Sequence, residues 1–197
     1  MVTYSFPYGR LVYFVTGNIH KFFEARQILA EYNIASAMLK IKVSEIQDDD
    51  IENIAKTGAR EAAKTSGLPV IVEDAGLFID ALNGFPGPYS KFVFNTIGLN
   101  GILRLLDNEQ KREAYFKSVV AFCNSEGTIK TFSGIVEGRI SNKIRGTGGF
   151  GFDPIFEPKG KVGRTFGEMS IEEKGRVSHR SRALRKFAVW YKKNYKF

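Results

Sequence analysis

The stretch of residues 70–91, VIVEDAGLFIDALNGFPGPYSK, decides how the rest of the chain is interpreted. Its apolar start, residues 70–72, follows a Gly-Leu-Pro segment and is typical of a buried central strand. Glu73 and Asp74 come directly after it, and two adjacent carboxylates at the end of a buried strand are costly unless the fold needs them there. In open α/β sheets, ligands bind at the carboxyl ends of the strands. Residues 70–74 therefore predict a strand that brings carboxylates into a ligand site.

The second half of this stretch, residues 84–91, is a stiff turn of Gly and Pro that ends in Ser90 and Lys91. Carboxylates suit a divalent cation and a lysine suits an anion, so the two halves together favour a metal and phosphate site. A solvated acidic strand end followed by a surface turn is the plainer alternative for this stretch taken alone.

The composition is that of an ordinary globular protein, with 43% hydrophobic and 25% charged residues in 197. We expect one domain over residues 1–197, built as two lobes with no separable linker. No apolar run approaches the roughly 20 residues of a membrane span, and the N-terminal segment lacks a signal-peptide pattern. These features predict a cytoplasmic protein without a membrane partner.

The number of cysteines and the position of the basic residues exclude some kinds of site and suggest others. Cys123 is the single cysteine and lies in an apolar run, which excludes an intrachain disulfide and predicts a core thiol. One Cys and two His do not make the usual four-ligand zinc site. The net charge of +8 comes from residues 174–197, which hold nine Lys or Arg and no acid. This basic segment either attracts a nucleotide or nucleic-acid backbone, or forms the solvated face of a terminal helix.

A strand, a glycine turn and a helix follow one another near the N-terminus. Residues 11–15 are apolar, residues 16–18 read Thr-Gly-Asn, and a helical pattern with Lys21 in its first turn follows. Free N–H groups and the helix dipole make such a turn a ready anion site. It lacks the Walker A pattern, so an ordinary strand-to-helix turn is equally consistent with it.

Hydrophobic periodicity predicts the remaining elements. Residues 38–43 alternate as in a half-buried strand, and the acidic run 48–50 precedes a helix that ends before Gly67. A short helix is expected at 101–106, and an antiparallel strand pair at 115–123 and 129–140, in which Gly134 and Gly138 mark bulges or close backbone approach. The last helix packs inward through Ala183, Leu184, Phe187, Ala188 and Tyr191.

Residues 146–154, GTGGFGFDP, form a loop of four glycines interleaved with two phenylalanines. Such a loop lets the backbone lie close to a ligand while a ring offers a stacking surface, or else it is a hairpin whose rings plug the core. His179 and Arg180 precede the last helix and suit hydrogen bonding to the edge of a heterocycle, although a His there is also a common cap or surface residue.

Four segments, in order, resemble the inosine triphosphate pyrophosphatase (Ham1-like) family: FVTGNIHKFFE, VEDAGLFIDALNGFPGPYSKF, GFGFDPIF and EKGRVSHRSRAL. The resemblance runs from about residue 12 to the last helix and is closest in pattern to archaeal and eukaryotic members. It implies Mg²⁺-dependent hydrolysis of ITP, dITP and XTP to the monophosphate and pyrophosphate. The fold expected is α/β, an elongated mixed sheet flanked by helices, with two lobes around a central nucleotide-binding cleft. The resemblance also implies a homodimer.

The same resemblance assigns roles by motif position. It implies that Asp74 is catalytic and that Glu45, Glu73 and Asp74 handle the metal. Implied phosphate contacts are Thr16, Gly17, Asn18, Lys21, Lys56, Lys91 and Lys174, and implied base contacts are Phe150, Gly151, Phe152, Asp153, His179 and Arg180. Ala75 stands where the family usually has serine, and Phe152 where it often has an aromatic with a polar handle.

Two other functions compete with this hypothesis. One is a Maf-like pyrophosphatase for modified pyrimidine nucleotides, against which the Ser-His-Arg segment and the glycine loop argue. The other is a nucleic-acid-binding protein that uses Arg182, Arg185 and Lys186 and has no need of Asp74. The second leaves the carboxylates and the glycine loop unexplained, so we expect no stable nucleic-acid partner.

Overall fold

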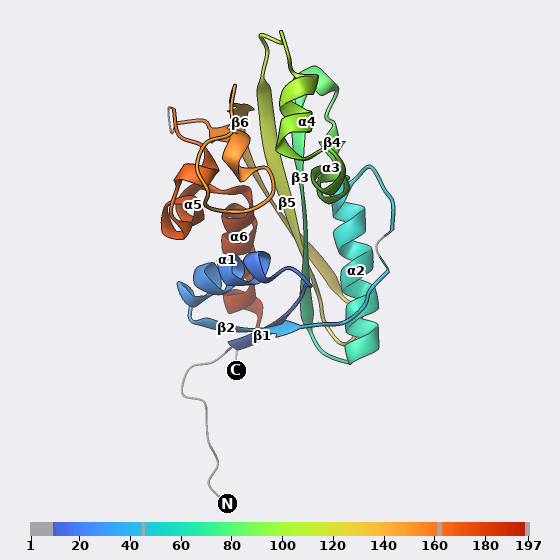
Figure 1. Ribbon diagram of the computed structural model, residues 1–197. Coiled ribbons are helices and arrows are strands. Elements are labelled where there is room, and N and C mark those ends of the chain that lie inside the picture. Colours follow the sequence, from blue (N-terminus) through green and yellow to red (C-terminus); the bar gives the residue numbers. More distant parts are fainter. Residues whose placement is uncertain (1–9, 45, 161–162, 196–197) are drawn as a thin grey trace, which may run out of the picture.

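The computed structural model describes residues 10–44, 46–160 and 163–195. In this part of the chain a seven-stranded mixed sheet has the order β2-β1-β3-β5-β6-β7, with β4 paired to β3 (Figure 1). The strands are β1 (Arg10–Val15), β2 (Ile34–Leu39), β3 (Val70–Ile79), β4 (Pro86–Gly87), β5 (Glu113–Cys123), β6 (Ile129–Ile140) and β7 (Phe156–Pro158). The predicted α/β class and the predicted β5–β6 pair are confirmed.

Helices cover both faces of the sheet (Figure 1). One face carries α1 and α6, the opposite face carries α2, and α3 and α4 pack at the far end. The α-helices are α1 (Ile19–Ala30), α2 (Ile51–Ser66), α3 (Ser90–Thr96), α4 (Gly98–Leu105), α5 (Ile171–Val177) and α6 (His179–Asn194). Short 3-10 turns are η1 (Asp80–Leu82), η2 (Asp153–Ile155) and η3 (Phe166–Glu168). Among the described residues, no helix combines the length and apolar content needed to span a bilayer.

Local sequence explains the long helices. In α2, Asp50 caps the first turn by accepting from the Glu52 N–H at 2.9 Å, and Gly67 ends the helix with φ +68°. Its alanine-rich buried face, which includes Ala55, Ala59 and Ala62, lies flat on β3 and β5. The five inward positions predicted for α6 are all buried, and Cys123 is buried as expected.

Three hydrophobic clusters pack on the sheet: one under α1 and α6, one under α2, and one at the far end with α3 and α4. Val120 and Phe122 of β5 belong to the core beneath α1 and α6. Ala114 and Phe116 of the same strand belong to the core shared with α4 and β7. Strand β5 therefore runs through both of these cores and joins them.

The strand prediction around Glu73 needs a correction. The apolar run predicts a strand that ends before Glu73, but β3 continues to Ile79 and pairs with β5 along its whole length. The parallel partner β1 covers only residues 70–72 of β3, and β4 joins only at residues 77–78. Residues 73–76 therefore lie in mid-strand, where the sheet opens on one side because β1 has ended.

Two further segments differ from expectation, and the structure decides between the alternatives left for a third. The second strand is Ile34–Leu39, so residues 40–43 lie outside it, although Ile41 and Val43 still pack against the core under α2. Helix α3 follows the Gly-Pro turn and was not predicted. Of the two alternatives left for Gly134 and Gly138, close approach is correct, because the β5–β6 register is unbroken. A Cβ at Gly134 would lie 2.1 Å from the His179 carbonyl oxygen.

Candidate active site

The turn after β1 is shaped by its own polar side chains. The Asn18 carboxamide oxygen accepts from the His20 N–H at 2.9 Å and from the Lys21 N–H at 3.2 Å, which caps α1. The Asn18 N–H donates to the Thr16 hydroxyl at 3.1 Å. At Gly17 an added Cβ would have no atom within 4 Å. The predicted strand, turn and helix N-terminus are present, and the anion role of the turn stays a prediction.

Lys21 joins this turn to the middle of β3. Its ammonium lies 2.9 Å from the Glu73 carboxylate and donates to the Glu73 carbonyl oxygen at 3.2 Å. The contact spans the opening left where β1 ends. The predicted phosphate lysine and a predicted metal carboxylate therefore form an ion pair with each other.

Glu73 is the buried centre of the site. Its carboxylate accepts from the Ser118 hydroxyl at 2.6 Å and lies 3.1 Å from Nε of Arg180, in addition to the Lys21 contact. Burial alone would raise its pKa, but the Arg180 and Lys21 charges outweigh burial and hold the Glu73 pKa well below its usual range. Glu73 is thus an ionised carboxylate held between two cations.

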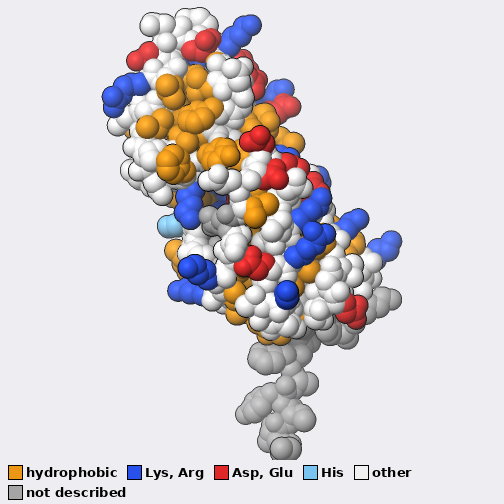
Figure 2. All heavy atoms as spheres, turned by 90° about the vertical axis from the view of Figure 1, so that its right-hand side faces the viewer, with side chains coloured by type: hydrophobic (Ala, Val, Ile, Leu, Met, Phe, Trp, Pro, Cys, Tyr) orange, Lys and Arg blue, Asp and Glu red, His pale blue; other side chains and the backbone are white. Residues whose placement is uncertain are grey.

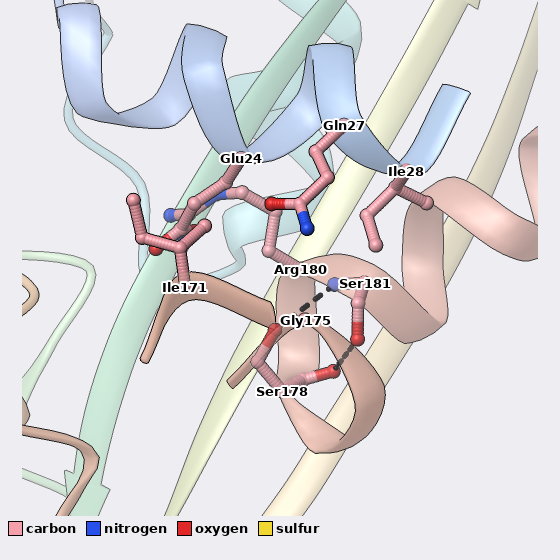
Figure 3. Close-up of a pocket in the computed structure, with 8 residues that line it drawn as sticks. All are labelled: Glu24, Gln27, Ile28, Ile171, Gly175, Ser178, Arg180 and Ser181. Carbon is pink, nitrogen blue, oxygen red and sulfur yellow. Dashed lines mark hydrogen bonds and ion pairs between the residues drawn. The ribbon is translucent and has the colours of Figure 1, made fainter. Parts of the chain in front are cut away.

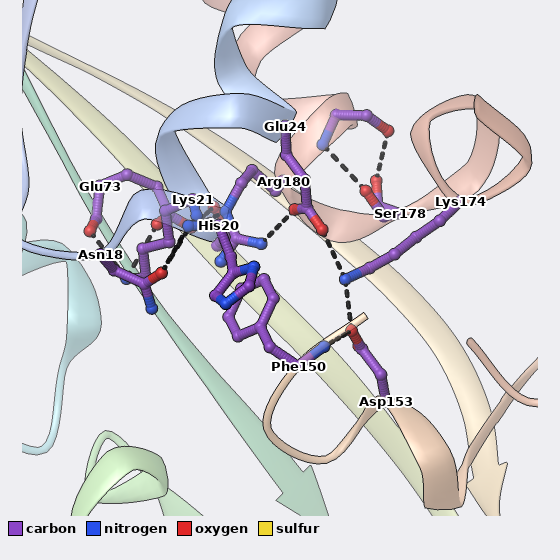
Figure 4. Close-up of polar contacts among 12 residues, drawn as sticks. Asn18, His20, Lys21, Glu24, Glu73, Phe150, Asp153, Lys174, Ser178 and Arg180 are labelled. Carbon is purple, nitrogen blue, oxygen red and sulfur yellow. Dashed lines mark hydrogen bonds and ion pairs between the residues drawn. The ribbon is translucent and has the colours of Figure 1, made fainter. Parts of the chain in front are cut away.

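The same chain of charges continues toward the glycine loop (Figure 4). Glu24 of α1 accepts from Arg180 at 2.6 Å and from Lys174 at 2.7 Å, and Lys174 also donates to Asp153 at 2.6 Å. Burial opposes ionisation of Glu24, yet Arg180 and Lys174 hold its pKa below the usual value. Three carboxyl groups and three basic groups alternate along this buried network. At its far end burial raises the pKa of Asp153, and the Lys174 charge acts against that shift.

Asp153 holds the glycine loop against this network. Its carboxylate accepts from the Phe150 N–H at 2.7 Å. A Cβ at Gly149, where φ is +69°, would lie 2.1 Å from that carboxylate, so only glycine fits there. The Phe150 ring lies 4.7 Å from the Lys174 ammonium and 5.3 Å from the Arg180 guanidinium. The loop therefore presents a half-buried ring beside two cations.

Of the remaining residues predicted to contact the base, some line the pocket and one belongs to the hydrophobic core. Phe152 is buried and meets Phe94 of α3 edge to face at 5.5 Å, so its ring plugs the core. Gly151 has φ +61° and open space where a Cβ would stand. His179 stacks on Phe116 at 4.5 Å and is buried. Burial, with Arg180 and Lys174 adding to it, holds the His179 pKa well below 6.5, so the imidazole is neutral.

One atom of His179 stands out within this pocket. Its Nδ1 is buried and has no hydrogen-bond partner among the described residues. A buried polar atom without a partner is costly, and a bound ligand that supplies one removes that cost. His179 is therefore suited to hydrogen bonding to a base.

Asp74 lies on the opposite face of β3 from Glu73, because successive side chains of a strand alternate. It stands in register with Val119, which belongs to the core under α2. Among the described residues there is no group of three or more His, Cys, Asp or Glu side chains placed to hold a metal ion. Glu45, the third predicted metal ligand, lies outside the described residues. The structure thus separates two carboxylates that the sequence placed together.

Two predicted phosphate lysines lie apart from the buried network. The Lys56 ammonium is 2.6 Å from the Glu52 carboxylate, which also accepts from Thr131 of β6, so Lys56 points along the α2 face toward β6. Lys91 lies in the first turn of α3. Neighbouring Ser90 does not point to a ligand, because its hydroxyl joins the Leu77 N–H to the Gly87 carbonyl.

The sequence interpretation missed Glu24 and Ser118. Glu24 follows Lys21 by three residues on the same helix, a spacing that places both on one face and was available as a signal. Ser118 carries no such signal, because a serine in a strand is common. Behind the Glu24–Arg180 pair lies a small hollow between α1, α5 and α6 (Figure 3), lined by Glu24, Gln27, Ile28, Ile171, Gly175, Ser178, Arg180 and Ser181.

Fold and site together define an α/β protein in which a buried charge network links the turn after β1, residue Glu73 of β3 and the glycine loop. A model of the Ham1 family matches residues 12–190, and the chain belongs to this family. A protein of Methanopyrus kandleri named dITP/XTP pyrophosphatase is 54% identical over 93% of this chain and 97% of the relative. A protein of the same name from Thermococcus kodakarensis is 49% identical over 93% and 98%. The structure of a HAM1 protein from Coxiella burnetii superposes with a TM-score of 0.82 at 28% identity, over 93% and 98% of the two chains.

Proposed function

We propose that this protein hydrolyses ITP, dITP and XTP between the α and β phosphates, giving the monophosphate and pyrophosphate and so cleansing the nucleotide pool. Relatives at 54% and 49% identity carry the name dITP/XTP pyrophosphatase. The observation that carries the proposal is the double pairing of Glu73, which ties Lys21 of the anion-type turn and Arg180 of the aromatic pocket to one carboxylate. A nucleoside triphosphate has a base at one end and phosphates at the other, so its site needs an aromatic pocket and an anion-binding turn held at a fixed distance from each other.

The phosphate end of the substrate is assigned to the turn after β1. The α1 dipole supplies positive potential there, and Lys21 supplies a full charge. Predicted contacts from Lys56, Lys91 and Lys174 remain predictions. The Lys174 ammonium contacts Phe150 and Asp153, which are both predicted base contacts. In this arrangement Lys174 therefore lies at the end of the site that we assign to the base.

The metal is assigned to Asp74 rather than to Glu73. A carboxylate is a hard oxygen donor that suits Mg²⁺. Both Glu73 oxygens face cations, and a metal bound there would have to displace Lys21 or Arg180, the two cations on which the proposal rests. We therefore assign Mg²⁺ to Asp74 and Glu45, and give Glu73 the task of orienting Lys21 and Arg180. When bound, the metal polarises the phosphate oxygens. Asp74 accepts the proton of the attacking water.

Base selection is assigned to His179 and Arg180. A neutral imidazole has one N–H to donate, and a 6-keto oxygen accepts it, whereas the 6-amino group of adenine leaves the donor unpaired. An unpaired buried group costs about 1 to 3 kcal/mol, which sets the expected preference for ITP over ATP.

Product analysis tests the proposal. The protein is incubated with ITP, XTP, dITP, ATP, GTP and dUTP in Mg²⁺, and pyrophosphate is resolved from orthophosphate. We expect pyrophosphate chiefly from the first three. Orthophosphate as the product, or equal turnover of ATP, contradicts the assignment.

Asp74→Asn separates catalysis from binding. Loss of the proton acceptor and of a metal oxygen should lower turnover of ITP at least a hundredfold, on the general scale of acid–base catalysis. Binding of ITP in EDTA, measured by calorimetry, should stay within a few fold of the unaltered protein. Asp80→Asn, on η1, is the matched control and should leave both measurements unchanged. Near-normal turnover by the Asp74 variant removes Asp74 from the mechanism.

The two rival functions make different predictions. A Maf-like enzyme prefers modified pyrimidine nucleotides, which the same panel detects through added 5-methyl-UTP. The nucleic-acid hypothesis needs free basic side chains, but Arg182 and Lys186 donate to the carbonyls of Ile135 and Ser133 at 2.6 and 2.7 Å. Arg185 pairs with Glu31, the residue that follows α1. These contacts favour the nucleotide hypothesis.

We further propose a homodimer that acts in the cytoplasm, where nucleotide pools are used. Figure 2 shows hydrophobic side chains gathered on the upper part of one face, where α3 and α4 lie. Phe92→Asp should convert a dimer into a monomer in light scattering, while Val189→Asp on the distant α6 should not. A monomeric unaltered protein, or a dimeric Phe92 variant, contradicts this. The exposed apolar residues of the face are Phe85, Tyr89, Phe92, Phe94, Ile97 and Leu105.

A further inference from the structure

His20 makes an aromatic contact that none of the assigned roles uses. Its imidazole stacks on the Phe150 ring with centroids 5.5 Å apart and an angle of 20° between the planes (Figure 4). His20 belongs to the first turn of α1, and Phe150 to the glycine loop 130 residues later. The contact therefore bridges the two sides of the pocket.

The imidazole is held there by stacking alone. Its backbone is fixed, because the His20 N–H donates to the Asn18 cap at 2.9 Å. The side chain is exposed, and in the described part of the chain its ring makes neither a hydrogen bond nor an ion pair. Rotation about its side-chain bonds meets little resistance, because an exposed side chain moves between staggered rotamers at small cost.

We propose that His20 is a purine-stacking residue, which covers Phe150 in the nucleotide-free protein and packs on the outer face of the base when substrate enters. The inference rests on the proposed function and adds a binding residue to it. Two rings in a sandwich with a base between them stand about 7 Å apart, twice the ordinary stacking distance, so 5.5 Å leaves no room for a base. His20 therefore swings outward by a few ångströms and keeps its stacking by exchanging Phe150 for the base.

The stack has a different selectivity from the polar contacts of the pocket. Stacking depends on ring area and not on the group at the 6-position, since every base has a π face. His20 should therefore stabilise ITP and ATP equally and favour both over a pyrimidine nucleotide, whose single ring overlaps less. Selection between hypoxanthine and adenine stays with His179 and Arg180.

A second role has to be separated from this one. His20 lies at a helix N-terminus beside the phosphate turn, so a protonated imidazole there is an alternative phosphate contact. Charge and ring area are separable by substitution. His20→Phe keeps the ring without the charge, His20→Lys keeps a charge without the ring, and His20→Ala removes both.

The test is calorimetric binding of ITP, ATP and UTP in EDTA, which prevents metal-dependent turnover. We expect His20→Ala to weaken ITP and ATP by the same factor of about five to ten, at the low end for base–aromatic stacking, and UTP by less than half that factor. His20→Phe should bind ITP within twofold of the unaltered protein, and His20→Lys should bind as poorly as His20→Ala. Phe23→Ala, an exposed aromatic on the same helix, is the matched control and should bind normally.

Other outcomes overturn the inference. Rescue by His20→Lys and not by His20→Phe makes His20 a phosphate contact. If His20→Ala binds ITP more tightly than the unaltered protein, the His20 ring only obstructs the pocket. If binding is unchanged, His20 has no role in binding. Failure of the proposed function is seen separately: a protein that binds ITP with the stated pattern but releases no pyrophosphate in Mg²⁺ keeps the stacking role and loses the reaction.

Discussion

Neutralising Glu73 is the most direct test of the buried charge network. The Glu73→Gln variant keeps the size and shape of the side chain but removes the negative charge between Lys21 and Arg180. The carboxamide oxygen of the new side chain still accepts from Ser118, so the change isolates charge from packing. The positive charges of Lys21 and Arg180 then lose the negative charge that Glu73 supplies in the unaltered protein.

The size of the effect follows from burial. The Glu73 side chain is 0% exposed and that of Arg180 3%, and breaking a buried pair by removing one partner costs about 3 to 5 kcal/mol. Because Arg180 keeps its Glu24 contact at 2.6 Å, we expect the low end, about 3 kcal/mol. In a chain of this size that lowers the melting temperature by about 6 to 12 °C.

The same group gives the effect a pH dependence. The folded-state pKa of Glu73 lies below its ordinary value of 4.5, so its stabilisation is fully present above about pH 4.5 and is lost as the pH falls toward the folded pKa. The difference in the free energy of unfolding between the two proteins should be constant from pH 7 to pH 5 and should shrink in more acidic solution.

Urea unfolding of the nucleotide-free and metal-free protein measures both effects. Glu52→Gln is the matched control, because the Glu52–Lys56 pair has similar chemistry but both side chains are 34% exposed, and such surface pairs contribute at most about 1 kcal/mol. Equal losses in the two variants, or a Glu73 effect that does not change below pH 4.5, would refute the account of Glu73 as a buried ionised carboxylate.

Three single positions give further predictions. Gly134→Ala should destabilise the protein by about 1 to 3 kcal/mol in thermal unfolding, because its Cβ meets the His179 carbonyl at 2.1 Å, whereas Gly175→Ala meets only an ordinary contact and should not destabilise it. In NMR, His179 should stay neutral from pH 8 to pH 6, because its pKa is well below 6.5; protonation in that range contradicts its burial among cations. Cys123, buried and with a pKa raised by burial, should react with a thiol reagent only in denaturant, and rapid labelling of the folded protein would place it at the surface.

Local patterns predicted the elements whose shape depends on neighbours in sequence. Helices α2 and α6 and the β5–β6 pair were found because a buried face repeats at a fixed period. The strand at residues 70–79 was predicted to end before Glu73, because charged residues normally end a buried apolar run. Glu73 continues it because Lys21 and Arg180, from distant parts of the chain, compensate its burial.

In the candidate site, too, the local motifs were predictable from the sequence and the contacts between distant residues were not. Its phosphate turn, glycine loop and Ser-His-Arg segment were each visible as motifs, and the resemblance set them in one family. The pairings within the site were not visible, since Glu24 meets Arg180 across 156 positions and Lys174 across 150. The stacking of His20 on Phe150 also depends on the approach of α1 to the loop.

The order of the residues was enough to predict the class of fold and the family, and it marked the phosphate turn, the glycine loop and the Ser-His-Arg segment as candidate site motifs. Packing in three dimensions was needed to show that Glu73 and Asp74 face opposite sides of β3, where the end of β1 opens the sheet, and that the site's cations are already paired with carboxylates. The difference arises because sequence periodicity reports which face of an element is buried, whereas burial of a charge depends on partners that other elements bring to it.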